Sequence, residues 1–308
     1  MALLEIDQLS IAFTRYTSIL RQRTTEVIHE LQLSIGEGEI VAVVGSSGSG
    51  KSLLAHAIMG ILPGNASVTG TLRYKGEPLD AARQVALRGK EIALVPQSVN
   101  YLDPLMRVGE QVRSSVDQQS LSLDAQRKVF ARYQLAEDVE RMYPFQISGG
   151  MARRVLLSTA VISGARLIIA DEPTPGLHQD VAQETLRQFR ELADEGCGIL
   201  LITHDIESAL QVADKVAVLY AGTIMEMALA ADFSGNGEQL RHPYTQALWK
   251  SLPQNEFKPI PGSQPLAGAL PDGCLFAPRC EHASDECSRL RPETHHIRGG
   301  SVRCIHAS

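Results

Sequence analysis

Short, continuous apolar runs alternate with polar, helix-forming stretches along most of this chain. Residues 40–44, 167–170, 198–202 and 216–220 are apolar runs with the length of buried strands. Short apolar strands that alternate with helices are typical of a mostly parallel sheet covered on both faces. The pattern therefore predicts an α/β fold. Its helices are expected at residues 53–59, 151–163, 181–193 and 206–212.

The first part of the chain has a different pattern, in which apolar and polar residues alternate. This alternation at residues 3–13 and 27–35 predicts two half-buried strands. Residues 15–25 between them are polar and basic, and we expect them to form a connection outside the strands. Further strands are predicted at residues 68–74 and 92–95, the second of them just before Gln97.

Changes in composition indicate how the chain is divided. A charged, helix-forming stretch predicts an inserted helical subdomain at about residues 102–160. A break in composition follows residue 233, and a proline-rich stretch at residues 253–271 leads into a cysteine-containing end. We therefore expect a larger domain at residues 1–233 and a smaller C-terminal region at residues 234–308.

Composition and charge narrow the class of protein. The 308 residues are 44% hydrophobic and 21% charged, which is typical of a globular protein with ample core. The formal net charge of -6 argues against nucleic acid as the default partner, because phosphate backbones attract basic surfaces. No apolar run reaches the roughly 18 residues of a membrane span. The first residues lack the basic and apolar segments of a secretory signal, so a cytoplasmic protein is expected.

A glycine-rich loop lies between the first apolar strand and the helix predicted to follow it. Its sequence fits G-x-x-x-x-G-K-[ST], which binds nucleotide phosphates when it joins a strand to a helix. Backbone N–H groups and the helix N-terminus would surround the phosphate oxygens. Lys51 would reach the β- and γ-phosphates, and Ser52 would bind Mg²⁺. The loop consists of Gly45, Ser46, Ser47, Gly48, Ser49, Gly50, Lys51 and Ser52.

Polar side chains follow three other predicted strands at the point where each strand ends. Asp171 and Glu172 come after residues 167–170, where Asp171 could hold Mg²⁺ and Glu172 could act as the base for an attacking water. His204 could sense the γ-phosphate and help to position that water. Gln97 could reach Mg²⁺ or the water. Together with the glycine loop, these residues predict hydrolysis of a nucleotide.

A second anion site is predicted at Ser148, Gly149 and Gly150. Ser148 is the expected cap of the helix that follows, and bare amides at a helix N-terminus attract anions. One nucleotide cannot easily contact two such sites so far apart in one chain. A second subunit would bring this site to the far side of its partner's γ-phosphate.

These features, in this order, resemble the nucleotide-binding subunit of an ABC transporter. The resemblance implies an α/β fold with a P-loop NTPase core of the RecA type, an inserted helical subdomain and a small β-subsheet. It also implies that two such cassettes pair head to tail around two ATP molecules. It also implies that Glu172 is the catalytic base, His204 the switch histidine and residues 148–150 the signature facing the partner's ATP. An aromatic side chain that stacks on adenine is expected upstream, with Phe13 the best fit to the register and Tyr16 the alternative.

Other motifs resemble the ATPase subunits of peptide, nickel and metallophore importers. They include Pro96-Gln97-Ser98, the methionine after Gly150 and the segment at residues 242–248. The resemblance implies a second ATPase, identical or paralogous, two membrane permease subunits, a substrate-binding protein and a place on the cytoplasmic face of the membrane. His178 departs from the family's usual interface loop, which bears on how this subunit signals across the interface. The resemblance also implies that the two ATP sites can be unequal, because importers of this type often use two different ATPases.

Four of the five cysteines lie in the last 35 residues. Disulfides are disfavoured in the cytoplasm, so metal binding is the better interpretation, although the closely spaced pairs that zinc prefers are absent. Four thiolates on loops also suit a [4Fe-4S] cluster. The resemblance favours this cluster over zinc or free thiols, because some peptide-importer ATPases carry one at matching positions. The candidate ligands are Cys274, Cys280, Cys287 and Cys304.

Two other functions fit parts of this pattern. One is a soluble ABC ATPase that acts on nucleic acid or the ribosome, but such proteins often have paired cassettes or long coiled-coil insertions, and neither is evident here. The other is a degenerate partner that binds ATP while another subunit hydrolyses it. The intact Asp171, Glu172 and His204 argue against this second function.

Overall fold

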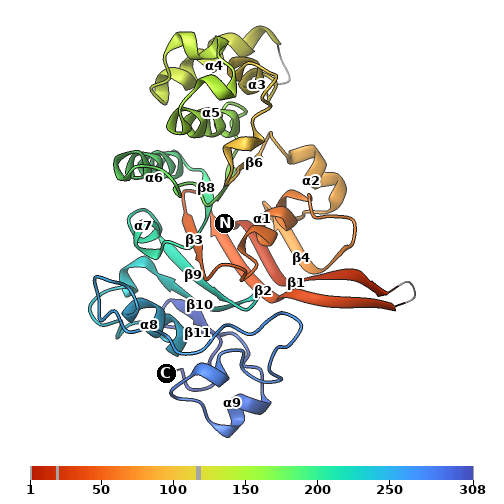
Figure 1. Ribbon diagram of the computed structural model, residues 1–308, viewed down its shortest axis with the longest axis vertical. Coiled ribbons are helices and arrows are strands. Elements are labelled where there is room, and N and C mark those ends of the chain that lie inside the picture. Colours follow the sequence, from red (N-terminus) through yellow and green to blue (C-terminus); the bar gives the residue numbers. More distant parts are fainter. Residues whose placement is uncertain (1, 19–20, 116–118, 308) are drawn as a thin grey trace.

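The computed structural model describes residues 2–18, 21–115 and 119–307. Parts of the predicted 15–25 connection and of the predicted helical insertion therefore lie outside the described residues. The described chain has a long shape in which α3, α4 and α5 form one end and α9 the other (Figure 1). The helices are α1 (Lys51–Met59), α2 (Ala81–Leu87), α3 (Val108–Arg113), α4 (Gln119–Arg132), α5 (Gly149–Val161), α6 (Gln179–Asp194), α7 (Ile206–Leu210), α8 (Pro243–Lys250) and α9 (Asp285–Arg289).

An eight-stranded sheet runs through the centre, in the order β11-β12-β10-β9-β3-β8-β7-β6. The five strands from β9 to β6 pair in parallel, and this confirms the predicted α/β fold. Every residue of β3 and β8 is buried, which explains their continuous apolar sequences. The bounds are β3 (Ile40–Val44), β6 (Ile92–Val95), β7 (Leu167–Asp171), β8 (Gly198–Thr203), β9 (Lys215–Tyr220), β10 (Thr223–Leu229), β11 (His295–Ile297) and β12 (Gly300–Val302).

The small sheet has the order β2-β1-β4-β5, with β1 (Ala2–Ser18), β2 (Arg21–Gly36), β4 (Ala66–Tyr74) and β5 (Glu77–Pro78). The prediction that residues 15–25 lie outside the strands was wrong. Within this stretch Arg15 pairs with Arg23 and Tyr16 with Gln22, so β1 and β2 extend as a long hairpin away from the sheet. Antiparallel backbone pairing needs no apolar face, and Thr14 and Thr24 also share a hydroxyl hydrogen bond of 3.0 Å.

The helical insertion has its own small core, separate from the sheet. Buried residues from α3, α4 and α5 pack together there, including Val112, Phe130 and Val155. The insertion is joined to the main sheet by the chain before α3 and after α5 (Figure 1). Arg153 of α5 also reaches back, because its Nη1 donates to the carbonyl oxygen of Pro96 at 3.2 Å. The insertion thus contacts the segment that carries Gln97.

The C-terminal region packs against the core of the main sheet. Phe276 and the rings of Tyr220 and Tyr244 contact one another, with ring centroids 4.5 to 5.5 Å apart. β12 pairs with β10, so the chain returns to extend the central sheet after the proline-rich stretch. The sequence pattern did not predict β10, β11 or β12. The division at residue 233 stays a prediction, since the two parts share one hydrophobic core.

Candidate active site

The glycine loop joins β3 to α1, as predicted, and its glycines are required by space and by backbone conformation. A Cβ on Gly45 would lie 2.4 Å from the carbonyl oxygen of Leu219. Gly50 has φ 103° and faces the side chain of Ile28, which a Cβ would approach to 2.5 Å. Only glycine adopts such backbone conformations without strain in so little space. The loop therefore curls tightly ahead of α1.

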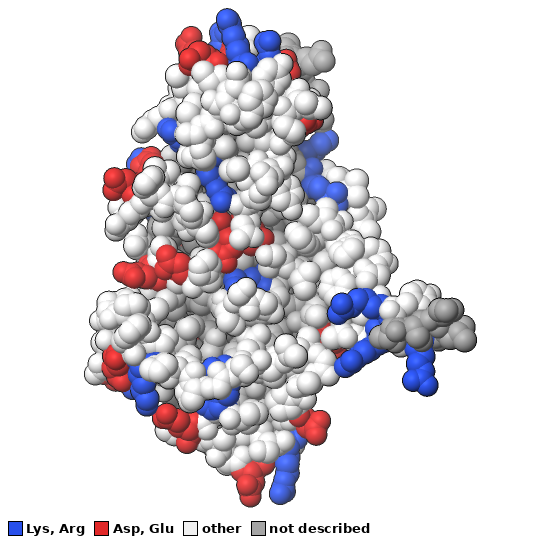
Figure 2. Space-filling model, viewed as in Figure 1, with Lys and Arg blue, Asp and Glu red and all other residues white. Residues whose placement is uncertain are grey.

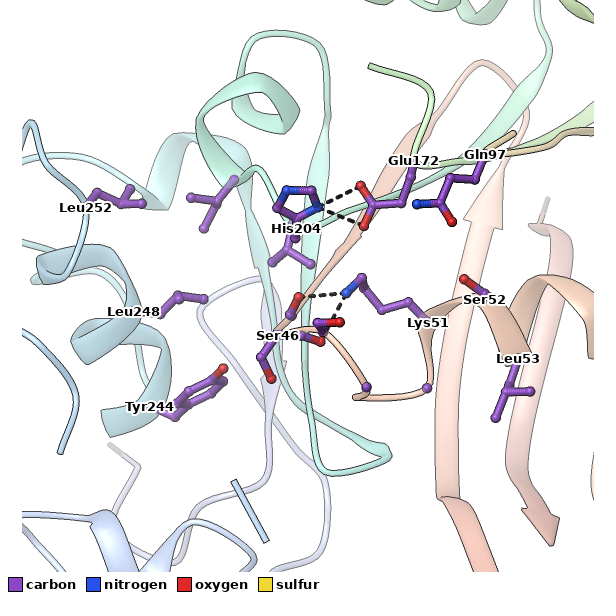
Figure 3. A pocket seen from close by; sticks show the side chains of 16 residues that line it. Ser46, Lys51, Ser52, Leu53, Gln97, Glu172, His204, Tyr244, Leu248 and Leu252 are labelled. Carbon is purple, nitrogen blue, oxygen red and sulfur yellow. Dashed lines mark hydrogen bonds and ion pairs between the residues drawn. The ribbon is translucent and has the colours of Figure 1, made fainter. Parts of the chain in front are cut away.

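Lys51 begins α1 and is 7% exposed. Its Nζ donates to the carbonyl oxygens of Gly45 at 2.7 Å and Ser46 at 3.1 Å. Burial lowers the pKa of this ammonium group, while the charges of Glu172 and Asp171 oppose the shift. The lysine thus lies under the loop with its charge directed at the carbonyl oxygens (Figure 3).

Ser52 and Asp171 come together, as expected for two magnesium ligands. The Ser52 hydroxyl donates to Oδ1 of Asp171 at 3.2 Å, across the gap between α1 and the end of β7. Asp171 is 6% exposed, and burial raises the pKa of its carboxyl group, while the bond from Ser52 opposes the shift. A hydroxyl and a carboxylate oxygen are the ligands that Mg²⁺ prefers. These two residues therefore fit a magnesium ion, though their role as ligands stays a prediction.

Glu172 lies directly beyond β7 in a strained conformation. Its φ of 47° is in the left-handed region, which is uncommon for residues other than glycine. Its N–H donates to the carbonyl oxygen of Ile202 at 2.8 Å, which ties this backbone to β8. Nδ1 of His204 lies 3.0 and 2.9 Å from the two carboxylate oxygens (Figure 3). The strained backbone and the histidine together hold a buried carboxylate in one orientation.

One cavity of about 730 Å³ is lined by Lys51, Ser52, Glu172 and His204 and also reaches Gln97. The C-terminal region supplies another wall of this cavity, through the three apolar side chains Tyr244, Leu248 and Leu252 (Figure 3). Sequence reasoning missed these three residues. Residues 242–248 stood out only as a family motif, and no local pattern shows that α8 lies beside the glycine loop.

The predicted signature lies away from this cavity. The Ser148 hydroxyl accepts from the N–H of Met151 at 3.3 Å, which confirms Ser148 as the cap of α5. Ser148 and Gly149 are exposed, and none of residues 148–150 lines the cavity. The structure thus leaves this helix N-terminus open on the insertion, where a different molecule can approach it. His178 is the N-cap residue of α6, but its side chain makes no capping hydrogen bond, and it is also exposed.

The two candidate aromatic residues have different surroundings. Phe13 is partly buried against the core under the small sheet. Tyr16 is 72% exposed and lines a second cavity of about 560 Å³ with Arg15, Arg23, Thr25 and Val27 of the hairpin. The far side of this cavity is formed by residues 266–269 of the C-terminal region. The exposed aromatic of the hairpin is therefore Tyr16.

The four C-terminal cysteines are reduced, and three of them, Cys274, Cys287 and Cys304, are buried. Burial raises the pKa of Cys274, Cys280 and Cys304, while backbone N–H groups next to these sulfurs oppose the shift. Among the residues that the structure describes, no group of three or more His, Cys, Asp and Glu side chains is placed to hold a metal ion. The fifth cysteine, Cys197, is buried, and its thiol donates to the carbonyl oxygen of Ala165.

Comparison with known proteins agrees with this geometry. Residues 28–175 match the family model of the ABC transporter, and residues 225–287 match that of the oligopeptide/dipeptide transporter, C-terminal region. The chain is 31% identical to the dipeptide transport ATP-binding protein DppD of Haemophilus influenzae, covering 99% of this chain and 95% of that protein. It is 33% identical to the oligopeptide transport ATP-binding protein OppD of Salmonella typhimurium, covering 94% of this chain and 89% of that protein.

Solved structures show the same fold. The dimeric, post-hydrolysis structure of the ATP-binding cassette MJ0796 bound to ADP and Pi superposes with a TM-score of 0.64 at 23% identity. That similarity covers 74% of this chain and 98% of the cassette. The uncovered quarter of this chain is in keeping with an additional region beyond the cassette. None of the helices in the described part of the chain is long and apolar enough to cross a membrane.

Proposed function

Because this chain belongs to the ATP-binding subunits of ABC transporters, in the oligopeptide/dipeptide group, we propose that it powers the import of peptides across a membrane. It is an ATPase of the ABC type. The observation that carries the proposal is the single cavity that Lys51, Glu172 and His204 line, with Ser52 and Asp171 hydrogen-bonded at its edge. Peptides are favoured as cargo because the relatives are named dipeptide and oligopeptide transport proteins, whereas no feature of the chain favours nickel or a metallophore.

The chemistry assigned to the chain follows from these contacts. The loop amides and Lys51 bind the phosphates of ATP, and Ser52, Asp171 and Gln97 hold Mg²⁺, which neutralises phosphate charge when bound. Glu172 orients the attacking water and accepts its proton. His204, at 2.9 Å from the Glu172 carboxylate, keeps this base in position.

A second ATPase subunit, a copy of this chain or a paralogue, is part of the proposal. Its support is the exposed N-terminus of α5 at residues 148–150, which lies outside the chain's own cavity and can face the partner's ATP. We also propose two permease subunits and a substrate-binding protein as further partners. The assembly would place this chain on the cytoplasmic face of the membrane.

A role on nucleic acid has weaker support. Lys and Arg are interspersed with Asp and Glu over most of the face in Figure 2, and they predominate only on the projecting hairpin. A nucleic-acid site needs a broad basic surface, which this face lacks. A degenerate, non-hydrolysing role is disfavoured because the carboxylate of Glu172 and its histidine partner are both in place.

The test is peptide uptake by the complete importer reconstituted in vesicles, with ATP hydrolysis measured in parallel. We expect Glu172→Gln to reduce both rates by about a hundredfold or more while ATP binding is retained, because the amide cannot accept the proton. Glu293→Gln, which changes an exposed carboxylate in the C-terminal region, is the matched control and should leave both rates unchanged. Hydrolysis by Glu172→Gln at the wild-type rate would refute the assigned base.

We further propose that Cys274, Cys280, Cys287 and Cys304 bind a [4Fe-4S] cluster. Its support is that the four free thiols include the donor type of such a cluster, and that backbone N–H groups bond the sulfurs of Cys274, Cys280 and Cys304 and favour their thiolates against the effect of burial. Because no group of three or more such side chains among the described residues is placed to hold a metal ion, the sulfurs would need to rearrange to bind the cluster. Iron and acid-labile sulfide in protein purified without oxygen would support the cluster, and Cys274→Ser should lose both. Cys197→Ser is the control, and bound zinc or four free thiols would contradict the proposal.

A further inference from the structure

Residues 261–269 of the C-terminal region cross the molecule from the cysteine-containing end to the phosphate loop and the hairpin. We call this segment the strap. Figure 1 shows a light-blue loop that reaches from the region of α8 and α9 toward β1 and β2. It belongs to the proline-rich stretch for which the sequence suggested no role beyond that of a linker.

The base of the strap is fixed by one arginine. Nε of Arg279 donates to the carbonyl oxygen of Pro261 at 2.7 Å, and its Nη2 donates to that of Ile260 at 3.3 Å. The same guanidinium lies 5.8 Å from the ring centroid of Tyr220 and 5.9 Å from that of Phe276. These rings belong to the buried aromatic cluster that joins the C-terminal region to the sheet. The strap therefore leaves the core in a defined direction.

The far part of the strap contacts both the phosphate loop and the hairpin. The Ser46 hydroxyl donates to Oε1 of Gln264 at 2.7 Å. Nη2 of Arg23, on β2, donates to the carbonyl oxygen of Gly268 at 3.2 Å. Between them the N–H of Ala269 donates to the carbonyl oxygen of Leu266 at 2.8 Å, which closes a turn. The strap thus joins two parts of the chain that lie more than 200 residues earlier in the sequence.

The strap contacts the phosphate loop and also forms one wall of the second cavity. The cavity with Lys51 begins at the phosphate loop, which includes Ser46, and the second cavity lies between the hairpin and the strap. In that second cavity Leu266 from the strap is 78% exposed, and Tyr16 from the hairpin is 72% exposed. Large apolar side chains that share one cavity and stay this exposed are available to bury a ligand's apolar faces.

We propose that the strap completes the nucleotide site, with Leu266 packing against the face of the base opposite Tyr16 and Gln264 holding the strap to the phosphate loop. This inference rests on the proposed function as an ATPase. A flat heterocycle fits between an aromatic ring and a branched aliphatic side chain, and its burial removes apolar surface of all three from water. The C-terminal region then contributes directly to nucleotide affinity.

The test compares a ligand that has a base with one that does not. Binding of Mg-ADP and of Mg-pyrophosphate to the purified full chain is measured by titration calorimetry, for wild type and for Leu266→Ala. We expect Leu266→Ala to bind ADP about tenfold more weakly, in line with the loss of a partly buried branched side chain, and to bind pyrophosphate as wild type does. Leu290→Ala removes a leucine of the same region that is 54% exposed and lines neither cavity, and it should change neither affinity.

A second variant separates the packing of Leu266 from the attachment of the strap to the phosphate loop. Gln264→Ala removes the hydrogen bond to Ser46 but keeps Leu266. Because the strap is then held less firmly, ADP should bind several-fold more weakly, whereas pyrophosphate should bind as it does to wild type. Unchanged or tighter ADP binding by Leu266→Ala would overturn the inference, because the strap would then lie aside from the base or block it. Equal losses for ADP and pyrophosphate would also overturn it, since they would indicate a general disturbance of the loop. Wild-type protein that bound neither ligand would refute the proposed function itself.

Discussion

Acid should destabilise this protein through one buried histidine, His242. Its side chain is 1% exposed and lies at the start of α8, where Nδ1 accepts from the N–H of Tyr244 at 2.9 Å. Its ring also contacts Phe276, with centroids 5.9 Å apart. Burial lowers the pKa of His242 from 6.5 to about 3, which the backbone of Arg303 opposes only weakly. The folded protein therefore keeps this imidazole neutral across the mildly acidic range.

The sign and size of the effect follow from linkage. Below pH 6.5 the unfolded chain binds a proton at His242, while the folded chain does not until about pH 3. The stability contributed by the neutral ring is therefore complete above pH 6.5 and is lost as the pH falls. Between pH 7 and pH 5 the loss in free energy of unfolding amounts to about 2 kcal/mol.

The assay is unfolding by urea at pH 7 and at pH 5, for wild type and for His242→Asn. Asparagine keeps an acceptor for the helix N-terminus but does not titrate. The variant should be less stable at pH 7, because it leaves a cavity, yet its loss between pH 7 and pH 5 should be smaller than that of wild type by about 2 kcal/mol. Burial also lowers the pKa of His29, whose contribution is present in both proteins and cancels. Equal losses in the two proteins would refute the reasoning.

Two further changes test the packing behind the site by urea unfolding. Arg241→Ala removes the charged partner of buried Glu226, to which Nη1 of Arg241 donates at 3.2 Å, and should lower the free energy of unfolding by about 3–5 kcal/mol. Lys258→Ala removes an ion pair at the surface and should lower it by less than about 1 kcal/mol. A loss below about 1 kcal/mol for Arg241→Ala would contradict this expectation. Gly222→Ala would place a Cβ 2.2 Å from the carbonyl oxygen of Val27, while Gly89→Ala, also at positive φ, meets no atom within 4 Å. The first should cost at least about 2 kcal/mol more than the second, and equal costs would show that the turn yields without strain.

Local chemistry explains why the phosphate loop and the residues at the strand ends could be predicted from the sequence. A buried strand must be apolar, and a loop that curls under Leu219 must have glycine at position 45, so both requirements are visible in the order of residues. The parallel sheet then brings Asp171 and the glycine loop to one edge. No long-range information beyond strand order is needed for this part of the site.

The hairpin and the strap depend on contacts that leave little trace in the sequence. Around Arg15 and Tyr16 neither face of the hairpin is apolar. The pairing of these residues with β2 is therefore specified by backbone hydrogen bonds rather than by burial. The strap has no regular hydrogen-bond pattern, and its position follows from single bonds such as that between Ser46 and Gln264. Sequence periodicity reports burial on one face of an element, and neither segment has such a face.

The polar side chains of the active site are already hydrogen-bonded within the protein, and this determines where binding energy for a nucleotide can come from. Lys51 donates to the carbonyl oxygens of Gly45 and Ser46, Ser52 donates to Asp171, and His204 contacts Glu172. Two of the three N–H donors of Lys51 are occupied in this way, so a phosphate can use the third donor but gains a further bond only by replacing a carbonyl bond, which yields less than a new bond would. The gain must come from charge, since an anion attracts the ammonium group more strongly than a neutral carbonyl does. Selectivity for a particular base cannot arise from these groups, because in the proposed function they bind only phosphate, metal and the attacking water. It must come from surfaces beyond the loop, and for that reason the affinity difference between ADP and pyrophosphate reports on the hairpin and the strap.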